Sequence, residues 1–296
     1  MNPETFHFHV GGFSCIAIRD TANRYPLGMF LTNLAKEQYE PLLRQRGENL
    51  EEIDLPYTCL VFQTERKRVL VDTGMGSNSF VPGKGKLLDH LRAEGIQPET
   101  IDTVIISHAH PDHIGGVLAE DGKLAFPNAR HVMFKEEWTY WMSNPSLAEL
   151  PVDEGFKGGM KTSARKNLLA IQGQLDLLER ESQILPGLSA IHAFGHSPGQ
   201  MALEISSAGD RLLFVADALI LPLNLQFPKA VGVTDHLPEA MVATRLRLLA
   251  KAATEKSLVS VTHFPFPGLG HVVPKGECWE WQPISAASES RAARSG

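Results

Sequence analysis

Short runs of β-branched and other apolar residues, bounded by polar or charged segments, recur along this sequence. Cys59–Phe62 and Arg68–Val71 flank the charged stretch at 64–67, and this pattern predicts a β-hairpin. Thr103–Ile106 is apolar enough to predict a buried strand. Further strand-like runs are Arg130–Phe134, Met201–Ile205 and Arg211–Val215. The pattern therefore predicts a core built on β-sheet.

Helix-like patterns lie between these strands. The apolar residues of Leu87–Glu94 have helical spacing, and Gly95 provides a stop signal directly after them. Longer helix-like stretches cover 163–182 and 237–255. Because strands and helices alternate, the sequence predicts an α/β protein or a helix-covered sandwich.

Length and composition limit the possible classes of protein. A chain of 296 residues is long for one domain, but α/β folds often fill this length. We expect residues 1–283 to form a single domain and the small, polar residues 284–296 to form a flexible tail. The formal net charge of −6 argues against a phosphate-binding surface, so nucleic acid is not an expected partner.

No apolar run approaches the roughly 18 residues of a membrane span, and the N-terminus does not resemble a signal peptide. We therefore expect no membrane partner and a cytoplasmic location. Cys15, Cys59 and Cys278 are odd in number and far apart, which predicts free thiols.

The segment SHAHPDHIGG, residues 107–116, concentrates ligand-capable side chains directly after the run at 103–106. In an extended segment His108 and His110 point the same way, and a turn at Pro111 brings Asp112 and His113 round to the same place. Imidazole and carboxylate suit zinc, manganese, iron or cobalt, and four ligands exceed the three of a single catalytic zinc. The spacing therefore indicates two metals. Gly115 and Gly116 allow the next segment to pack closely against the strand.

HAHPDH resembles the HxHxDH signature of the metallo-β-lactamase superfamily, which implies an αββα sandwich with its metal site at one edge. The resemblance also implies three later ligands, each after a strand-like run: His196 in GHSPGQ, Asp217 in LFVADA and His263 in VTHFPFPG. Asp72 in VLVDTGMG resembles the family's early aspartate, which orients ligands and does not bind metal.

Carried over to this chain, the resemblance implies two divalent metal ions, with zinc expected first and manganese, cobalt or iron as alternatives. It assigns His108, His110 and His196 to one ion, and Asp112, His113 and His263 to the other. It also implies that Asp217 bridges the ions. Asp112 and Asp217 are the candidate catalytic residues, because Asp112 can orient a hydroxide and pass a proton to the leaving group.

The branch of the family is a separate question. Asp217 disfavours a β-lactamase, and we do not expect the flavodiiron or glyoxalase II branches, whose extra regions have no evident counterpart in residues 1–296. The acyl-homoserine lactonases share all seven ligands but commonly have a tyrosine where this chain has Ile220. We expect a hydrolase of lactones or related esters with phosphotriesterase side activity. An organophosphate and aryl-ester hydrolase of the methyl parathion hydrolase type is the alternative, and a non-catalytic or redox metal protein is a second.

Candidate substrate contacts follow from sequence position and from the same resemblance. Trp141 resembles an aromatic residue of a leaving-group pocket, and Ile220 occupies the position of the lactonase tyrosine. The others are Phe264, Phe266 and His271 near the ligand His263, and Met29 and Phe30 in an apolar stretch that can serve as a lid or a dimer contact. The family resemblance suggests a homodimer.

Overall fold

The computed structural model describes residues 2–77, 80–81 and 83–284. The first of its two seven-stranded sheets has the strand order β1-β2-β3-β4-β5-β6-β7, antiparallel from β1 to β4 and parallel from β4 to β7. Its strands are β1 (Thr5–Val10), β2 (Phe13–Pro26), β3 (Glu52–Gln63), β4 (Arg68–Val71), β5 (Thr103–Ile105), β6 (Arg130–Phe134) and β7 (Leu175–Leu178).

The second sheet has the order β14-β13-β12-β11-β10-β9-β8, and β11 and β12 are its one parallel pair among the described strands. Its strands are β8 (Ser182–Leu185), β9 (Leu188–His192), β10 (Met201–Ser207), β11 (Asp210–Phe214), β12 (Leu258–Ser260), β13 (Leu269–Lys275) and β14 (Cys278–Pro283). The helices are α1 (Lys36–Arg46), α2 (Leu87–Ala93), α3 (Pro111–Ile114), α4 (Lys135–Met142), α5 (Glu154–Ile171) and α6 (Pro238–Glu255).

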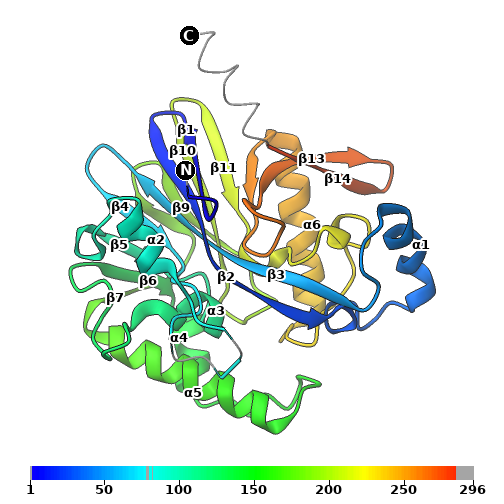
Figure 1. Ribbon diagram of the computed structural model, residues 1–296, viewed down its shortest axis with the longest axis horizontal. Coiled ribbons are helices and arrows are strands. Elements are labelled where there is room, and N and C mark those ends of the chain that lie inside the picture. The colour runs from blue at the N-terminus through cyan, green and yellow to red at the C-terminus, as the bar shows by residue number, and fades with distance from the viewer. Residues whose placement is uncertain (1, 78–79, 82, 285–296) are drawn as a thin grey trace.

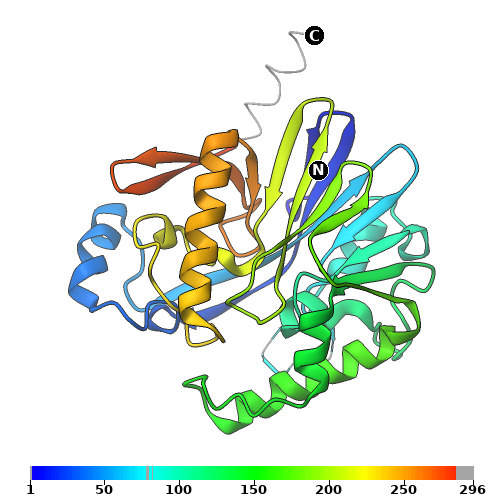
Figure 2. The ribbon, with the colours of Figure 1, turned by 180° about the vertical axis from the view of Figure 1, so that it is seen from behind.

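The two sheets pack face to face and helices cover their outer faces. Buried apolar side chains of both sheets meet between them, with Phe62 and Ile105 from the first sheet and Phe214 from the second. Figure 1 shows α2, α4 and α5 beside the first sheet, and Figure 2 shows α6 lying across the second. The predicted αββα sandwich is therefore confirmed.

The local predictions are mostly confirmed. Cys59–Phe62 and Arg68–Val71 lie in β3 and β4, which pair as an antiparallel hairpin. The helix predicted for 163–182 is wrong at its end, because α5 stops at Ile171 and residues 175–178 form β7. The parallel ladder to β6 outweighs the helical spacing there.

Several elements lie outside the predicted pattern, among them β8, β9, β12, β13, β14, α1 and α4. The N-terminal strands β1 and β2 were not predicted, because β2 mixes exposed and buried positions along 14 residues and carries a bulge between Arg19 and Thr21. At the other end, Ile284 belongs to the fold and not to the tail: its backbone N–H donates to the Leu269 carbonyl at 3.1 Å. The predicted flexibility of the remaining tail, residues 285–296, lies outside the described residues.

Candidate metal centre

The HAHPDH segment occupies the loop after β5 and runs into α3, whose first residue is Pro111. The turn is tight because Gly115 and Gly116 lie against the loop that follows β4. A Cβ on Gly116 would lie 2.0 Å from the Thr73 carbonyl oxygen, so no larger residue fits without movement. Thr73 in turn donates its backbone N–H to the His113 carbonyl at 2.7 Å. The predicted close packing of the glycine pair is confirmed, but its partner is the loop after β4 and not the strand itself.

The other candidate ligands approach from the same edge of the sandwich. His196 lies in the loop after β9, Asp217 in a short 3-10 turn after β11, and His263 directly after β12. Ala216, beside Asp217, has a positive φ of 45°, a conformation that costs energy in a non-glycine residue. Such strain is common where a functional side chain must be aimed precisely at a site.

The structure brings all seven predicted ligands together. Three groups of side chains each offer ligand atoms within 4.8 Å of one another: His108, His110 and His196; His108, His113 and Asp217; and Asp112, His113 and His263. Asp217 lies between the groups, with its Oδ2 3.2 Å from His196 Nε2 and 3.1 Å from His263 Nε2. This arrangement would accommodate two adjoining metal ions, with Asp217 close to ligands of both.

Each of four histidines is oriented by the ring nitrogen that points away from the centre. The pairs are His113 Nδ1 with Asp72 Oδ2 at 2.7 Å, His196 Nδ1 with Asp235 Oδ1 at 2.8 Å, His263 Nδ1 with the Pro56 carbonyl at 2.9 Å, and His110 Nε2 with His236 Nε2 at 3.3 Å. An outer N–H donated to a carboxylate or carbonyl leaves the inner nitrogen with its lone pair free for a metal. Asp72 thus contacts the ligand His113 on the side of the ring that faces away from the centre.

Several ligand atoms that face the centre lack a hydrogen-bond partner of good geometry. His108 Nε2, His113 Nε2 and Asp217 Oδ1 are buried without a hydrogen-bond partner among the described residues. His113 Nε2 and Asp217 Oδ1 lie 3.2 Å apart, both facing the same small space. Leaving such groups unpaired costs about 1–3 kcal/mol each, and more when a group is charged. A pair of cations satisfies all of them, so the donor set fits two divalent metal ions.

The protonation states of His108, His110 and Asp217 also suit metal binding. Burial, and then the neighbouring imidazoles, hold the pKa values of His108 and His110 well below the usual range of histidine, so both rings are neutral. Burial alone would raise the pKa of Asp217, but the surrounding histidines, His263 first, hold it well below its ordinary value. A neutral imidazole and an ionised carboxylate are the forms that bind a metal. At His113 and His263 burial alone would lower the pKa, but the neighbouring carboxylates, Asp217 first, outweigh it and raise the pKa, so metal binding there displaces a proton.

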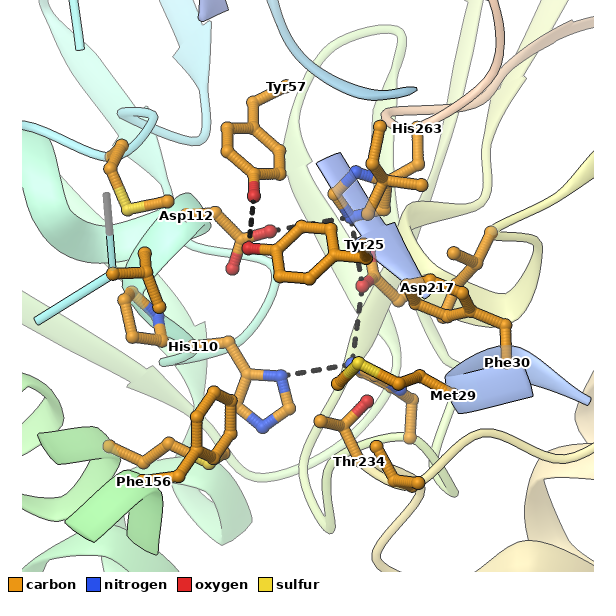
Figure 3. Close-up of a pocket in the computed structure, with 18 of the residues that line it drawn as sticks. Tyr25, Met29, Phe30, Tyr57, His110, Asp112, Phe156, Asp217, Thr234 and His263 are labelled. Atoms are coloured by element: carbon orange, nitrogen blue, oxygen red, sulfur yellow. Dashed lines mark hydrogen bonds and ion pairs between the residues drawn. The ribbon is translucent and has the colours of Figure 1, made fainter. Parts of the chain in front are cut away.

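A pocket opens over the centre and is mostly apolar (Figure 3). The ligands His110, Asp112, His196, Asp217 and His263 form its floor, and its walls are Tyr25, Met29, Phe30, Leu55, Tyr57, Met75, Phe80, Val81, Pro111, Phe156, Met160, Ile220, Val233 and Thr234. Neither lysine nor arginine occurs among these lining residues. The described part of the pocket therefore has no fixed positive side chain for an anionic substrate.

Three of the predicted substrate contacts, Met29, Phe30 and Ile220, line this pocket. Trp141 does not: it is buried behind the ligand His110, with ring centroids 5.8 Å apart. Its place there comes from α4, which packs beneath the ligand loop. Whether Met29 and Phe30 act as a lid or as a dimer contact stays a prediction, as does the homodimer itself.

The three predicted contact residues that follow His263 in sequence also lie outside the pocket lining. Phe264 is buried in the core under α6 and packs edge-on against Trp281 at 5.0 Å. The ring of Phe266 lies near the Arg19 guanidinium, at 5.7 Å. The Nδ1 of His271 lies 3.1 Å from the Ser257 carbonyl oxygen. The turn between β12 and β13 carries Phe264 and Phe266, and β13 carries His271. None of the three lines the pocket, so the structure does not bring these predicted substrate contacts to the site.

Three residues that support the metal ligands were not identified from the sequence: Asp235, His236 and Glu137. His236, which matched no ligand position, is buried with Nε2 against His110 and Nδ1 2.9 Å from the Tyr140 hydroxyl. No sequence signal pointed to it, because it lies 126 residues from the ligand that it supports.

The fold and the site together define a binuclear metal-binding αββα protein. The chain belongs to the metallo-beta-lactamase superfamily, whose family model matches residues 53–263, more than half of the sequence.

Curated relatives share moderate identity with this chain. An N-acyl homoserine lactonase of Bacillus sp. is 27% identical over 233 residues, covering 72% of this chain and 83% of the relative. The N-acyl homoserine lactonase AiiA of Bacillus thuringiensis subsp. kurstaki is 26% identical over 231 residues, covering 71% and 82%.

Solved structures are similar over nearly the whole chain. AidC, a dizinc quorum-quenching lactonase solved with a product, N-hexanoyl-L-homoserine, superposes with a TM-score of 0.88 at 28% identity, covering 95% of this chain and 97% of AidC. The hydrolase AbOPH superposes with a TM-score of 0.87 at 24% identity, covering 96% and 99%, which supports the fold alone. The protein is a metal-dependent hydrolase, and the alternative of a non-catalytic or redox metal protein is not retained.

In the described residues, no helix has the length and apolar character to cross a membrane.

Proposed function

We propose that this protein opens the ring of N-acyl homoserine lactones, using two zinc ions. His108, His110 and His196 would hold one ion, Asp112, His113 and His263 would hold the other, and Asp217 is within reach of both groups. The observation that carries the proposal is a complete seven-ligand centre at the floor of an apolar pocket without a lining lysine or arginine. That pocket suits an uncharged ester with an apolar acyl chain. The dizinc relative AidC, captured with a homoserine product, supports the same substrate class.

The zinc pair, when bound, supplies water of lowered pKa and a Lewis acid for the substrate carbonyl. Asp112 is the ligand best placed to move a proton, because its side chain is 19% exposed while Asp217 is 4% exposed. Its Oδ2 lies 3.5 Å from His263 Nε2 and it also faces the pocket. From there its carboxylate can take a proton and deliver it to the leaving oxygen.

Two phenols provide the main polar group of the pocket wall. The hydroxyl oxygens of Tyr25 and Tyr57 lie 2.7 Å apart, and Asn23 donates its side-chain N–H to Tyr57 at 3.2 Å. Figure 3 shows this pair beside Asp112. Burial, followed by the charge of Asp112, raises the pKa of Tyr57, so its phenol stays protonated.

The direction of this hydrogen-bond chain determines which proton is available to substrate. Tyr57 is 1% exposed, so its proton must be used within the pair or left unsatisfied at a cost of about 1–3 kcal/mol. Tyr57 therefore donates to Tyr25. Tyr25 is only partly buried, and its other polar neighbour, the Asn23 side chain, also donates to it, so its own proton is free to bind a substrate oxygen.

The function is tested by incubating zinc-loaded protein with N-hexanoyl-L-homoserine lactone and following release of the open-chain acid. We expect saturable hydrolysis that chelation of zinc abolishes. Hydrolysis no faster than that of the metal-free protein would overturn the proposal.

An aryl phosphotriester is the second candidate substrate. Phe80 and Phe156 meet edge-on in the pocket wall with centroids 5.2 Å apart, an arrangement that suits an aromatic leaving group. The ratio of kcat/KM for the lactone to kcat/KM for an aryl phosphotriester decides between the two. A ratio above one supports the lactonase, and a ratio well below one supports the phosphotriesterase.

A further inference from the structure

Behind the centre lies a buried carboxylate that neither binds metal nor reaches the pocket. Glu137, in α4, has no solvent exposure. Its Oε1 accepts the Ala109 backbone N–H at 2.8 Å and the Trp141 indole N–H at 2.7 Å. Its Oε2 accepts the Gly199 backbone N–H at 2.9 Å, and the Ser197 hydroxyl lies 2.6 Å from both oxygens. Glu137 thus accepts hydrogen bonds from segments that are far apart in sequence.

These donors are adjacent to the ligands of one metal position. Ala109 stands between His108 and His110, and Ser197 follows His196. Trp141, held by the same carboxylate, packs against the His110 ring. All three ligands of this position therefore lie next to a group that Glu137 holds.

The loop after β9, which carries His196 and Ser197, approaches α4 closely because Gly199 has no side chain. A Cβ on Gly199 would lie 2.1 Å from the Glu137 backbone nitrogen, so only glycine lets this loop reach α4. The backbone N–H of Gly199 then meets the carboxylate directly. Hydrogen bonds to Glu137 thus hold the segment GHSPGQ against α4, which lies under the HAHPDH loop.

The other metal position has different support. Asp72 holds His113, and the Pro56 carbonyl holds His263, while no contact joins Glu137 to either ligand or to Asp112 among the described residues. Asp72 also accepts the backbone N–H and hydroxyl of Ser107, at 2.7 and 2.8 Å. The Ser107 hydroxyl in turn lies 3.1 Å from His108 Nδ1, so Asp72 supports both halves of the centre, whereas the contacts of Glu137 adjoin only the ligands of one half.

We propose that Glu137 is a positioning residue for the metal held by His108, His110 and His196, and that it sets the affinity of this position independently of the other. The inference rests on the division of ligands in the proposed function. It concerns metal binding, however, and is tested without substrate. A carboxylate that only stabilised the fold would change both metal positions equally through global unfolding.

The test separates the two positions by removing a ligand from one of them. In a His263→Ala background the group of three histidines is intact, and in a His196→Ala background the group of Asp112, His113 and His263 is intact. Metal-free protein of each background, with and without Glu137→Gln, is titrated with Zn²⁺ against a chromophoric chelator. The amide keeps the size of the carboxylate but replaces one acceptor oxygen with a donor.

We expect Glu137→Gln to lower zinc affinity about 10- to 100-fold in the His263→Ala background and less than about 3-fold in the His196→Ala background. Ser197→Ala, which removes a single donor, should give a smaller loss in the same background and covers the case in which Glu137→Gln does not fold. The control is Glu136→Gln, an exposed neighbour on the same helix.

Equal losses in both backgrounds, or unchanged affinity in both with Glu137→Gln folded, would overturn the inference. So would a matching loss in Glu136→Gln. Failure to hydrolyse lactones leaves these zinc affinities untouched, so a failure of the proposed substrate and a failure of this inference are distinguishable.

Discussion

At the scale of single residues, what separates a ligand from other histidines here is the partner of its second nitrogen. His113 and His196 each face a buried aspartate on one side and the metal centre on the other. His131 is also buried, but it lies in β6 without any hydrogen-bond partner among the described residues. Burial alone therefore does not identify a ligand, and convergence of several oriented rings does.

Replacing Asp217 with asparagine should be the most damaging isosteric change in the centre. Its oxygens approach His113, His196 and His263, and an amide loses the charge that offsets two cations. We expect kcat to fall by about 100-fold or more and bound zinc to drop below two per chain. The check is kcat together with the metal content of the same folded sample. Near-normal activity in a fully loaded Asp217→Asn protein would show that this carboxylate does not bridge the ions.

Tyr25→Phe removes the proposed hydrogen bond to substrate and leaves the metal ligands intact. Loss of a preorganised donor to a developing charge costs about 100- to 1000-fold, but Tyr25 is only partly buried, so we expect kcat/KM for the lactone to fall about 10- to 100-fold at unchanged zinc content. Tyr39→Phe is the matched control, because Tyr39 is a buried phenol outside the pocket lining. Activity of Tyr25→Phe within about twofold of wild type would remove Tyr25 from the mechanism.

At the scale of elements, the ligand turn depends on close contact between two backbones. The sequence predicted this contact from the glycine pair at 115–116, and the structure places it against the loop after β4. The β3–β4 hairpin and β6 were also predictable, because their apolar runs and the polar residues that bound them are visible in short stretches of sequence. β7 was not, because only its pairing with β6 makes 175–178 a strand.

Gly116→Ala should destabilise the protein, since the added Cβ would lie 2.0 Å from the Thr73 carbonyl. We expect a loss of about 2–4 kcal/mol in the free energy of unfolding, together with weaker zinc binding. Gly158→Ala is the matched control, because this glycine lies inside α5 with no atom within 4 Å of the added Cβ. Alanine there should add about 0.5–1 kcal/mol. Denaturant unfolding measures both, and equal effects would refute the close-contact argument.

At the scale of the whole molecule, the site joins parts of the chain that no local pattern connects. The seven ligands were predictable because a dense motif and three strand-end residues carry a recognisable signature. Glu137, Asp235 and His236 were not, since each supports a ligand across a long sequence separation. The pocket wall likewise draws Tyr25 and Tyr57 from two long N-terminal strands, of which β2 was unpredicted.

Acid should unfold the protein partly through His131. Burial lowers the pKa of His131 from its ordinary 6.5 to about 4. Between these values the unfolded chain binds a proton that the folded chain does not, so stability is lost as the pH falls from 6.5 towards 4. The full shift corresponds to about 3 kcal/mol.

His131→Leu should therefore flatten the dependence of unfolding free energy on pH in this window, measured by denaturant titration at pH 7, 5.5 and 4.5. His9→Asn, an exposed histidine, is the control and should leave the slope unchanged. An equally steep loss of stability in His131→Leu would mean that other groups account for the acid sensitivity.

The central claim is that a pair of metal ions, and not one, makes this protein a lactone hydrolase. The most direct measurement is the initial rate of N-hexanoyl-L-homoserine lactone hydrolysis as metal-free protein receives zero to three equivalents of Zn²⁺, with bound zinc counted at each point. We predict a rate that reaches its plateau at two bound ions per chain. A plateau at one ion, or lactone hydrolysis without bound metal, would contradict the account.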